Sequence, residues 1–152
     1  MHPYIQTLLL AATPIGELRL SIPLALTAFN LSITEAYIIS IIGNLIPVVF
    51  LLLFLEEVSK FLIKRSEFFT KFFEWLFQRT RRRIEGKYKH YGYIALVILV
   101  AIPLPITGAW SGSAAAYLLG IPFWRAFGLI ALGILIAGVV VTLASLGIIS
   151  IV

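Results

Sequence analysis

Two charged residues, Glu17 and Arg19, interrupt an apolar stretch of the chain and are the first candidates for chemistry. A charge placed at the centre of a membrane helix costs about 2.5–3.5 kcal/mol on insertion scales, so such residues are functional hypotheses by default. A carboxylate there can take up a proton, bind a coupling ion or bind a charged group of a substrate. The alternative is a structural ion pair or an interfacial anchor. Because residues two apart on a helix do not face each other, direct pairing would require a break in the helix.

The composition places these residues in a membrane protein. Of the 152 residues, 61% are hydrophobic and 12% are charged, whereas a soluble domain carries about 25% charged residues. The chain has no cysteine and no aspartate, and its histidines are His2 and His90. We therefore expect no enzymatic centre, no metal site and no cofactor. The net charge of +5 comes from basic residues that flank apolar segments, which membrane topology explains better than nucleic-acid binding.

The first apolar block, residues 3–29, is broken near its middle. Proline and glycine interrupt it at Pro14, Gly16 and Pro23. Each arm has about a dozen residues, whereas a spanning helix needs roughly 20. Two short arms around such a tip predict a re-entrant hairpin, which enters and leaves the membrane on one side, with Glu17 near its tip.

A long apolar helix follows this block. Ser32 and Glu35 fit a capping box at its start, and the apolar pattern predicts a helix that ends at about residue 55. Asn44 and Pro47 fall near its middle. Because Pro47 lacks a backbone donor, it frees a carbonyl close to the bilayer midplane. Asn44 then either lines a cavity or satisfies that freed backbone.

A second apolar block, residues 91–119, carries no charge and is broken in a similar way. Its breaks are Pro103, Pro105, Gly108 and Gly112. Irregular backbone survives in lipid only where it is buried in protein or lines a wet cavity. The cavity candidates at this tip are Thr107, Trp110 and Ser111. The alternatives are close helix packing at the glycines and an interfacial anchor at the tryptophan. A helix from about residue 122 to about residue 146 follows.

Between the two halves, residues 57–90 hold ten of the twelve Lys and Arg residues. Phenylalanines recur at helical spacing opposite these charges, which predicts an amphipathic helix lying in the membrane interface. We expect an arginine cluster to contact lipid headgroups: Arg81, Arg82 and Arg83. The alternative is that the basic residues only fix topology. Nothing here resembles a base-reading module, so no nucleic acid is expected.

The two halves repeat one order of elements: broken block, short turn, long helix. A shift of 91 residues places Pro14 on Pro105, and a shift of 90 places Gly43 on Gly133. The fold class is therefore all-α integral membrane, an inverted repeat of a re-entrant helical hairpin plus a transmembrane helix. Residues 1–152 form a single membrane domain, with repeat 1 at 3–56, the linker at 57–90 and repeat 2 at 91–150.

Topology follows from the basic linker. The positive-inside rule makes residues 57–90 cytoplasmic, and one crossing per repeat then puts both termini outside a multi-pass protein of the cell membrane. If each block instead spans the membrane, four full helices result and both termini lie inside. The proline, glycine and polar residues at both tips favour re-entrance.

These features resemble the DedA / SNARE-associated (VTT-domain) membrane protein superfamily, most closely its branch of small multidrug export proteins. The resemblance is carried by residues 14–23 (P-I-G-E-L-R-L-S-I-P), 103–112 and 116–127. It implies opposed re-entrant hairpins, and transport in which an acidic residue of the first hairpin and arginines of the second take part. Glu17 matches the acidic position. No arginine lies within residues 91–124, so Arg19 would supply the cation from the first hairpin.

We thus expect a small DedA-like transporter of an amphipathic or lipid-linked substrate, coupled to a proton or another ion through Glu17. The predicted substrate and ion site is Glu17, Arg19, Asn44, Thr107, Trp110 and Ser111. The expected partners are membrane lipids, the substrate, the coupling ion and a second copy of the chain in a homodimer. The alternatives are a lipid scramblase or flippase-like protein without ion coupling, a small multidrug exporter, and a non-transporting scaffold.

Overall fold

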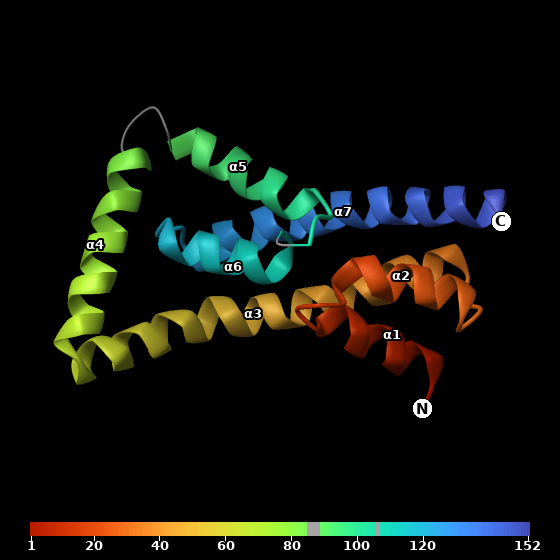
Figure 1. Cartoon of the computed structure of the whole chain (residues 1–152), viewed down its shortest axis with the longest axis horizontal. Coiled ribbons are helices and arrows are strands. Elements are labelled where there is room, and N and C mark those ends of the chain that lie inside the picture. Colours follow the sequence, from red (N-terminus) through yellow and green to blue (C-terminus); the bar gives the residue numbers. More distant parts are fainter. Residues whose placement is uncertain (85–88, 106) are drawn as a thin grey trace.

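The computed structural model describes the backbone of residues 1–84, 89–105 and 107–152, and their side chains except those of 73, 76, 77, 79–84 and 89. The described residues form helices joined by short turns (Figure 1). The helices are α1 (Pro3–Ala12), α2 (Glu17–Thr27), α3 (Ile33–Arg65), α4 (Glu67–Ile84), α5 (Lys89–Ala101), α6 (Ala109–Leu118) and α7 (Phe123–Ile151).

Helices α3 and α7 form the long axis of the molecule. They have 33 and 29 residues and are long and apolar enough to cross a membrane, which requires about 20 residues. The two helices run in opposite directions, as Figure 1 shows. Gly138 of α7 makes their close contact possible, since a Cβ there would lie 2.7 Å from Cε2 of Tyr37 on α3. The Tyr37 hydroxyl also donates to the carbonyl of Leu135 at 2.9 Å.

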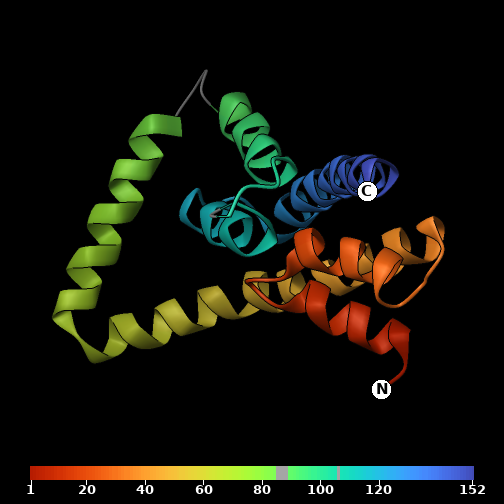
Figure 2. The same cartoon turned by 45° about the vertical axis from the view of Figure 1, so that its right-hand side comes forward.

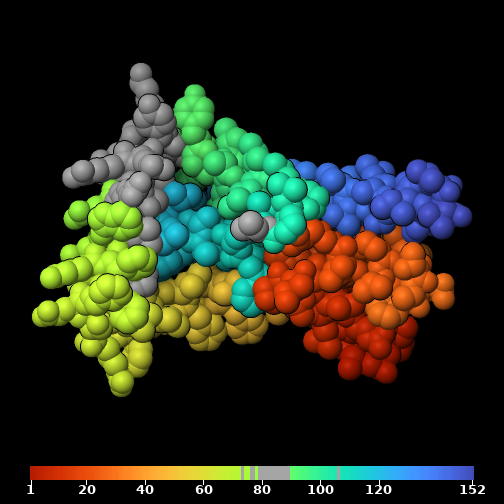
Figure 3. Space-filling view, in the orientation of Figure 1, coloured from red at the N-terminus to blue at the C-terminus, as the bar shows by residue number. Residues whose placement is uncertain are grey.

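Two helical hairpins, α1–α2 and α5–α6, approach this pair from opposite ends. Figures 1 and 2 show that the tips of the hairpins meet near the middle of the molecule. The space-filling view shows the first hairpin (red to orange) in direct contact with the second (green to teal) (Figure 3). Both chain termini lie at one end of the long axis, and α4 lies at the other.

One glycine in each half lets the first arm of a hairpin pack against the long helix that follows it. A Cβ at Gly43 of α3 would lie 2.5 Å from the backbone oxygen of Leu8 on α1. A Cβ at Gly133 of α7 would lie 2.6 Å from Cβ of Val100 on α5. Since Gly43 and Gly133 are also the residues matched in the sequence repeat, both halves dock their hairpins at equivalent places.

The turn after each hairpin is built alike. Asn30 has φ 52° and Gly120 has φ 67°, the left-handed conformation that commonly ends a helix. The long helices then start differently. Ser32 and Glu35 form the predicted capping box at the start of α3, whereas the N-cap of α7 is Pro122, which makes no side-chain capping bond.

The linker differs from the single amphipathic helix that the sequence predicted. Helix α3 does not end at about residue 55 but continues to Arg65, because residues 55–65 contain no proline or glycine and the backbone becomes extended only at Ser66. Helix α4 starts after that residue and carries the basic residues up to 84. Likewise α7 extends past residue 146 to Ile151. The expected headgroup contacts of residues 81–83 lie outside the described side chains.

Several of the predicted breaks do not interrupt a helix. Pro23 lies within α2 and Pro47 within α3. A proline inside a helix removes one backbone hydrogen bond. In a membrane protein, groups on neighbouring helices can supply a new partner for the freed carbonyl. Gly112 lies within α6, where it lets α6 approach Val100 of α5 closely. The remaining breaks, at Pro14, Gly16, Pro103, Pro105 and Gly108, do lie between helices.

Candidate functional site

The tip of the first hairpin is held by one threonine. The Thr13 hydroxyl donates to the carbonyl of Leu10 at 2.8 Å and accepts from the backbone N–H of Gly16 at 3.0 Å. Glu17 follows as the first residue of α2, with φ 42°. This left-handed conformation is unusual for a residue other than glycine. Such strain costs about 1–3 kcal/mol and is found preferentially at functional sites.

A threonine also holds the tip of the second hairpin. The Thr107 hydroxyl donates to the carbonyl of Ile102 at 2.5 Å and accepts from the N–H of Leu104 at 3.1 Å. These bonds occupy the hydroxyl that the sequence assigned to substrate or ion binding. They also give hydrogen-bond partners to the carbonyl of Ile102 and the N–H of Leu104, in a segment where Pro103 and Pro105 have no N–H to donate.

The carboxylate of Glu17 lies where the two tips meet. The backbone N–H of Trp110, in the first turn of α6, donates to Glu17 Oε1 at 3.4 Å. Gly108 has φ 141° and lies so close that a Cβ there would collide with the carboxylate. The Trp110 indole N–H donates to the carbonyl of Ala12 at 3.3 Å. Glu17 is therefore bound to the start of α6, where the helix dipole favours a negative charge.

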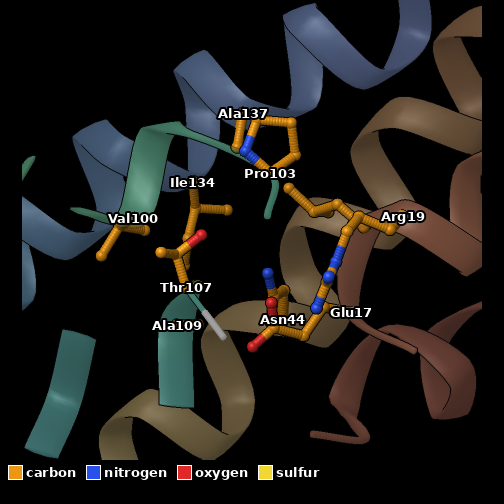
Figure 4. Close-up of a pocket in the computed structure, with 11 residues that line it drawn as sticks. Glu17, Arg19, Asn44, Val100, Pro103, Thr107, Ala109, Ile134 and Ala137 are labelled. Atoms are coloured by element: carbon orange, nitrogen blue, oxygen red, sulfur yellow. The ribbon is translucent and has the colours of Figure 1, made fainter. Parts of the chain in front are cut away.

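A small pocket adjoins this contact (Figure 4). Its empty volume is about 250 Å³, and the space within it that can hold water is about large enough for one molecule. Its lining comes from both tips and both long helices: Glu17, Leu18, Arg19, Asn44, Val100, Pro103, Thr107, Gly108, Ala109, Ile134 and Ala137. The pocket thus lies between the two halves of the chain.

Polar groups in this pocket are incompletely paired. The side chain of Asn44 is 2% exposed, and its Oδ1 has no hydrogen-bond partner. Glu17 is 6% exposed. Among the described residues, the only ion pair joins Lys60 and Glu56, so Arg19 makes none there. A carboxylate, a guanidinium and a free carbonyl oxygen around one small space can hold a proton, a water molecule or a charged group.

Four of the six predicted site residues line the pocket: Glu17, Arg19, Asn44 and Thr107. Trp110 contributes through its backbone, and its ring bridges the two hairpins. Ser111 does not line the pocket, and its hydroxyl donates to the carbonyl of Gly108 at 3.3 Å within the first turn of α6. The described residues contain no group of three or more potential His, Cys, Asp or Glu metal ligands.

Two buried polar residues near this site were missed in the sequence. Ser21 and Ser40 are both fully buried, and neither hydroxyl has a partner. The available signal was their spacing, because Ser21 is four residues after Glu17 and Ser40 is four residues before Asn44. Residues four apart share one helix face.

A second, larger hollow lies at the linker end of α3. It has about 940 Å³ of empty volume and mainly apolar walls, which include Leu52 and Phe123. The Tyr117 hydroxyl donates to Ser59 at its edge. The ion pair of Lys60 with Glu56, at 3.0 Å, also borders it. This hollow has room for many more water molecules than the small pocket has.

Comparison with known proteins gives one family. A family model described as "Putative small multi-drug export protein" matches residues 17–140, which begin at Glu17 directly after the first hairpin tip and include the second tip and both long helices up to residue 140. No curated protein and no solved structure matches the chain significantly.

Proposed function

The chain belongs to the small multi-drug export protein family, and from this premise we propose that it is a transporter in which Glu17 couples substrate movement to a proton. The observation that carries the proposal is the position of this carboxylate. It belongs to the first hairpin but accepts a hydrogen bond from Trp110 of the second. One protonation event can therefore change the contact between the two halves.

The coupling step follows from the charge of Glu17. In the charged state, the carboxylate is attracted to the N–H groups and to the positive end of the helix dipole at the start of α6. In the protonated state, most of that attraction is lost and the two tips are held together more weakly. Proton binding would then release one hairpin from the other, which exposes the pocket to one side of the membrane and then to the other.

Two features support re-entrant hairpins. The four hairpin arms have 10, 11, 13 and 10 residues, and helices of that length extend only about 15–20 Å. The hydrocarbon core of a bilayer is about 30 Å thick. The tips also meet halfway along α3 and α7 (Figure 1). An inverted repeat of the DedA / VTT kind fits this arrangement, with the linker in the cytoplasm and both termini outside.

Arg19 points to the chemistry of the substrate. Its guanidinium lines the pocket and makes no ion pair among the described residues. An unpaired cation in a membrane protein favours an anionic partner. We therefore propose an amphipathic or lipid-linked substrate with a negatively charged group. A homodimer would enclose a longer path than a single chain provides.

Uptake into proteoliposomes driven by a pH gradient tests this function, and dodecyl phosphate is a suitable amphipathic anion as the probe. The wild-type protein should accumulate the probe, and Glu17→Gln should lose the dependence on the gradient while it remains folded. Gradient-driven uptake by Glu17→Gln at the wild-type rate would refute proton coupling through this residue.

The larger hollow favours a second candidate function. Its apolar walls and its Lys60–Glu56 pair lie at the linker end of the molecule, where a lipid tail and headgroup could both make contacts. A scramblase would use such a hollow without ion coupling. Movement of a labelled phospholipid between leaflets at equal rates with and without a pH gradient would identify this function.

A further inference from the structure

The buried hydroxyl groups of the described residues fall into two classes. In the first class, the hydroxyl donates to a carbonyl three or four residues earlier in its own helix. These bonds are Thr7 to Pro3 at 2.9 Å, Ser59 to Glu56 at 2.8 Å, Ser113 to Ala109 at 2.7 Å, Thr142 to Gly138 at 2.7 Å and Ser145 to Val141 at 2.7 Å. Ser21 and Ser40 form the second class, because neither makes this bond. Their hydroxyls are free to bond to something else.

The two serines occupy matched positions on packed helices. Helices α2 and α3 lie side by side and run in opposite directions (Figures 1 and 2). Ser21 is one turn from Glu17 along α2, and Ser40 is one turn from Asn44 along α3. Both steps lead from the pocket toward the end of the molecule that holds the termini. The polar groups thus form a row that starts at Glu17.

All three unpartnered atoms of the described, buried side chains belong to this row: Ser21 Oγ, Ser40 Oγ and Asn44 Oδ1. Buried polar groups without a protein partner are normally satisfied by ordered water. A buried water typically makes about three hydrogen bonds to such groups. The two serine hydroxyls, on the adjacent helices α2 and α3, and the amide carbonyl of Asn44 supply suitable donors and acceptors.

We propose that Ser21, Ser40 and Asn44 hold a short chain of water molecules that carries protons between Glu17 and the membrane face where the termini lie. This inference rests on the proposed function, since it supplies the proton that Glu17 uses. In each step, a water donates one proton to its neighbour and receives another from the neighbour behind it. The last proton forms the O–H bond of the Glu17 carboxyl group, and a hydronium ion in the solvent supplies the first.

Among the titratable groups near Ser21, Ser40 and Asn44, Glu17 is the one that can accept the proton. Arg19 is the nearest charged side chain on α2, and the adjoining stretch of α1, residues 5–12, has no titratable residue. On α3, the next acidic residue toward the termini is Glu35, which accepts from the Tyr4 hydroxyl at 2.5 Å. Helices α6 and α7 have no charged residue facing the pocket.

The row is closed at its outer end in this structure. The next residues at the same spacing are Ala25 on α2 and Ala36 on α3, and both are fully buried. Their small side chains separate the serines from the exposed turn that follows α2. A slight separation of α2 from α3 would therefore connect the row to the solvent. In the closed state, solvent protons cannot reach Glu17 from the membrane face where the termini lie.

Hydrogen–deuterium exchange of the protonated Glu17 carboxyl group tests the proposal without a substrate. Infrared spectra in acidic buffer would identify the carboxyl band by its loss in Glu17→Gln. After mixing with D2O, exchange should be slower in Ser21→Ala/Ser40→Ala than in the wild type by about 100-fold, the low end of the effect of a positioned proton-transfer group. Ser113→Ala and Ser145→Ala are matched controls because their hydroxyls bond within their own helices.

A second pair of variants tests the direction of the path. Ala36→Val should narrow the path at the outer end of the row and slow exchange. Ala126→Val, at the equivalent and equally buried position of the second repeat, should leave the exchange rate unchanged. Equal exchange rates in the wild type and the double serine variant would overturn the proposal. An exchange rate reduced as much by Ala126→Val would also contradict it. Neither result depends on whether Glu17→Gln still transports the probe.

Discussion

The two hairpins have the same architecture but contribute different chemistry. The first hairpin supplies both charges of the site, Glu17 and Arg19, whereas the described residues of the second hairpin's tip supply none. The second supplies backbone instead: the N–H of Trp110 and, at Gly108, the absence of a side chain where the Glu17 carboxylate lies. The carboxylate of one hairpin thus fits the helix start of the other. Protonation can therefore change the charge of the first hairpin while the backbone donor of the second hairpin keeps its geometry.

The largest effect is expected where the carboxylate meets the glycine. Gly108→Ala places a Cβ into the Glu17 carboxylate and requires φ 141° from a residue with a side chain. We expect a loss of at least about 1–3 kcal/mol in unfolding free energy from the backbone strain alone, together with loss of uptake. Thermal unfolding monitored by size-exclusion chromatography measures the first effect.

Gly128→Ala is the matched control for that substitution. Gly128 lies within α7, and a Cβ there would meet no atom within 4 Å. Alanine should stabilise the helix by about 0.5–1 kcal/mol. Equal destabilisation by the two substitutions would show that Gly108 has no special contact with the first hairpin.

The two docking glycines test whether the halves are packed equivalently. Gly43→Ala and Gly133→Ala should each destabilise the protein by about 1–3 kcal/mol through overpacking. Gly43→Ala should have the larger effect, because its new Cβ meets the backbone oxygen of Leu8, whereas at Gly133 the nearest atom belongs to the Val100 side chain. Unfolding midpoints in a common detergent measure both effects. A neutral result at either position would show that its hairpin is not held there.

The smallest expected effect concerns the starts of the long helices. Ser32→Ala removes the capping box of α3 and should cost about 0.5–2 kcal/mol. Pro122→Ala removes no side-chain capping bond from α7, so it should have a smaller effect. The same unfolding assay compares them, and equal losses would contradict this difference between the halves.

The sequence predicted the order of elements because its signals are local. Proline and glycine mark both tips, the apolar lengths distinguish short arms from long helices, and Ser32 with Glu35 marks the start of α3. The end of α3 was predicted about ten residues too early, at about residue 55 instead of Arg65. The reason is that the change from apolar to charged residues there marks a change of environment and does not break the helix.

The contacts of the site depend on the tertiary structure and were not predictable in the same way. Glu17 and Arg19 stood out by their charge, but the partner of Glu17 is a backbone N–H 93 residues away. A backbone N–H is present at every residue except proline, so the sequence cannot indicate which one will bind Glu17. The hydroxyls of Ser21 and Ser40 resemble those of other helical serines in the sequence. Only the three-dimensional structure shows that they are buried without partners.

We propose that the two hairpins enter the membrane from opposite faces and meet at Glu17. Ser32 and Pro122 are exposed, matched N-cap positions of α3 and α7, and the chain has no native cysteine. Single Ser32→Cys and Pro122→Cys variants can therefore be labelled with a membrane-impermeant maleimide. In intact cells we predict labelling of Ser32→Cys alone, with Pro122→Cys labelled only after permeabilisation. Labelling of both from the same side would contradict the account.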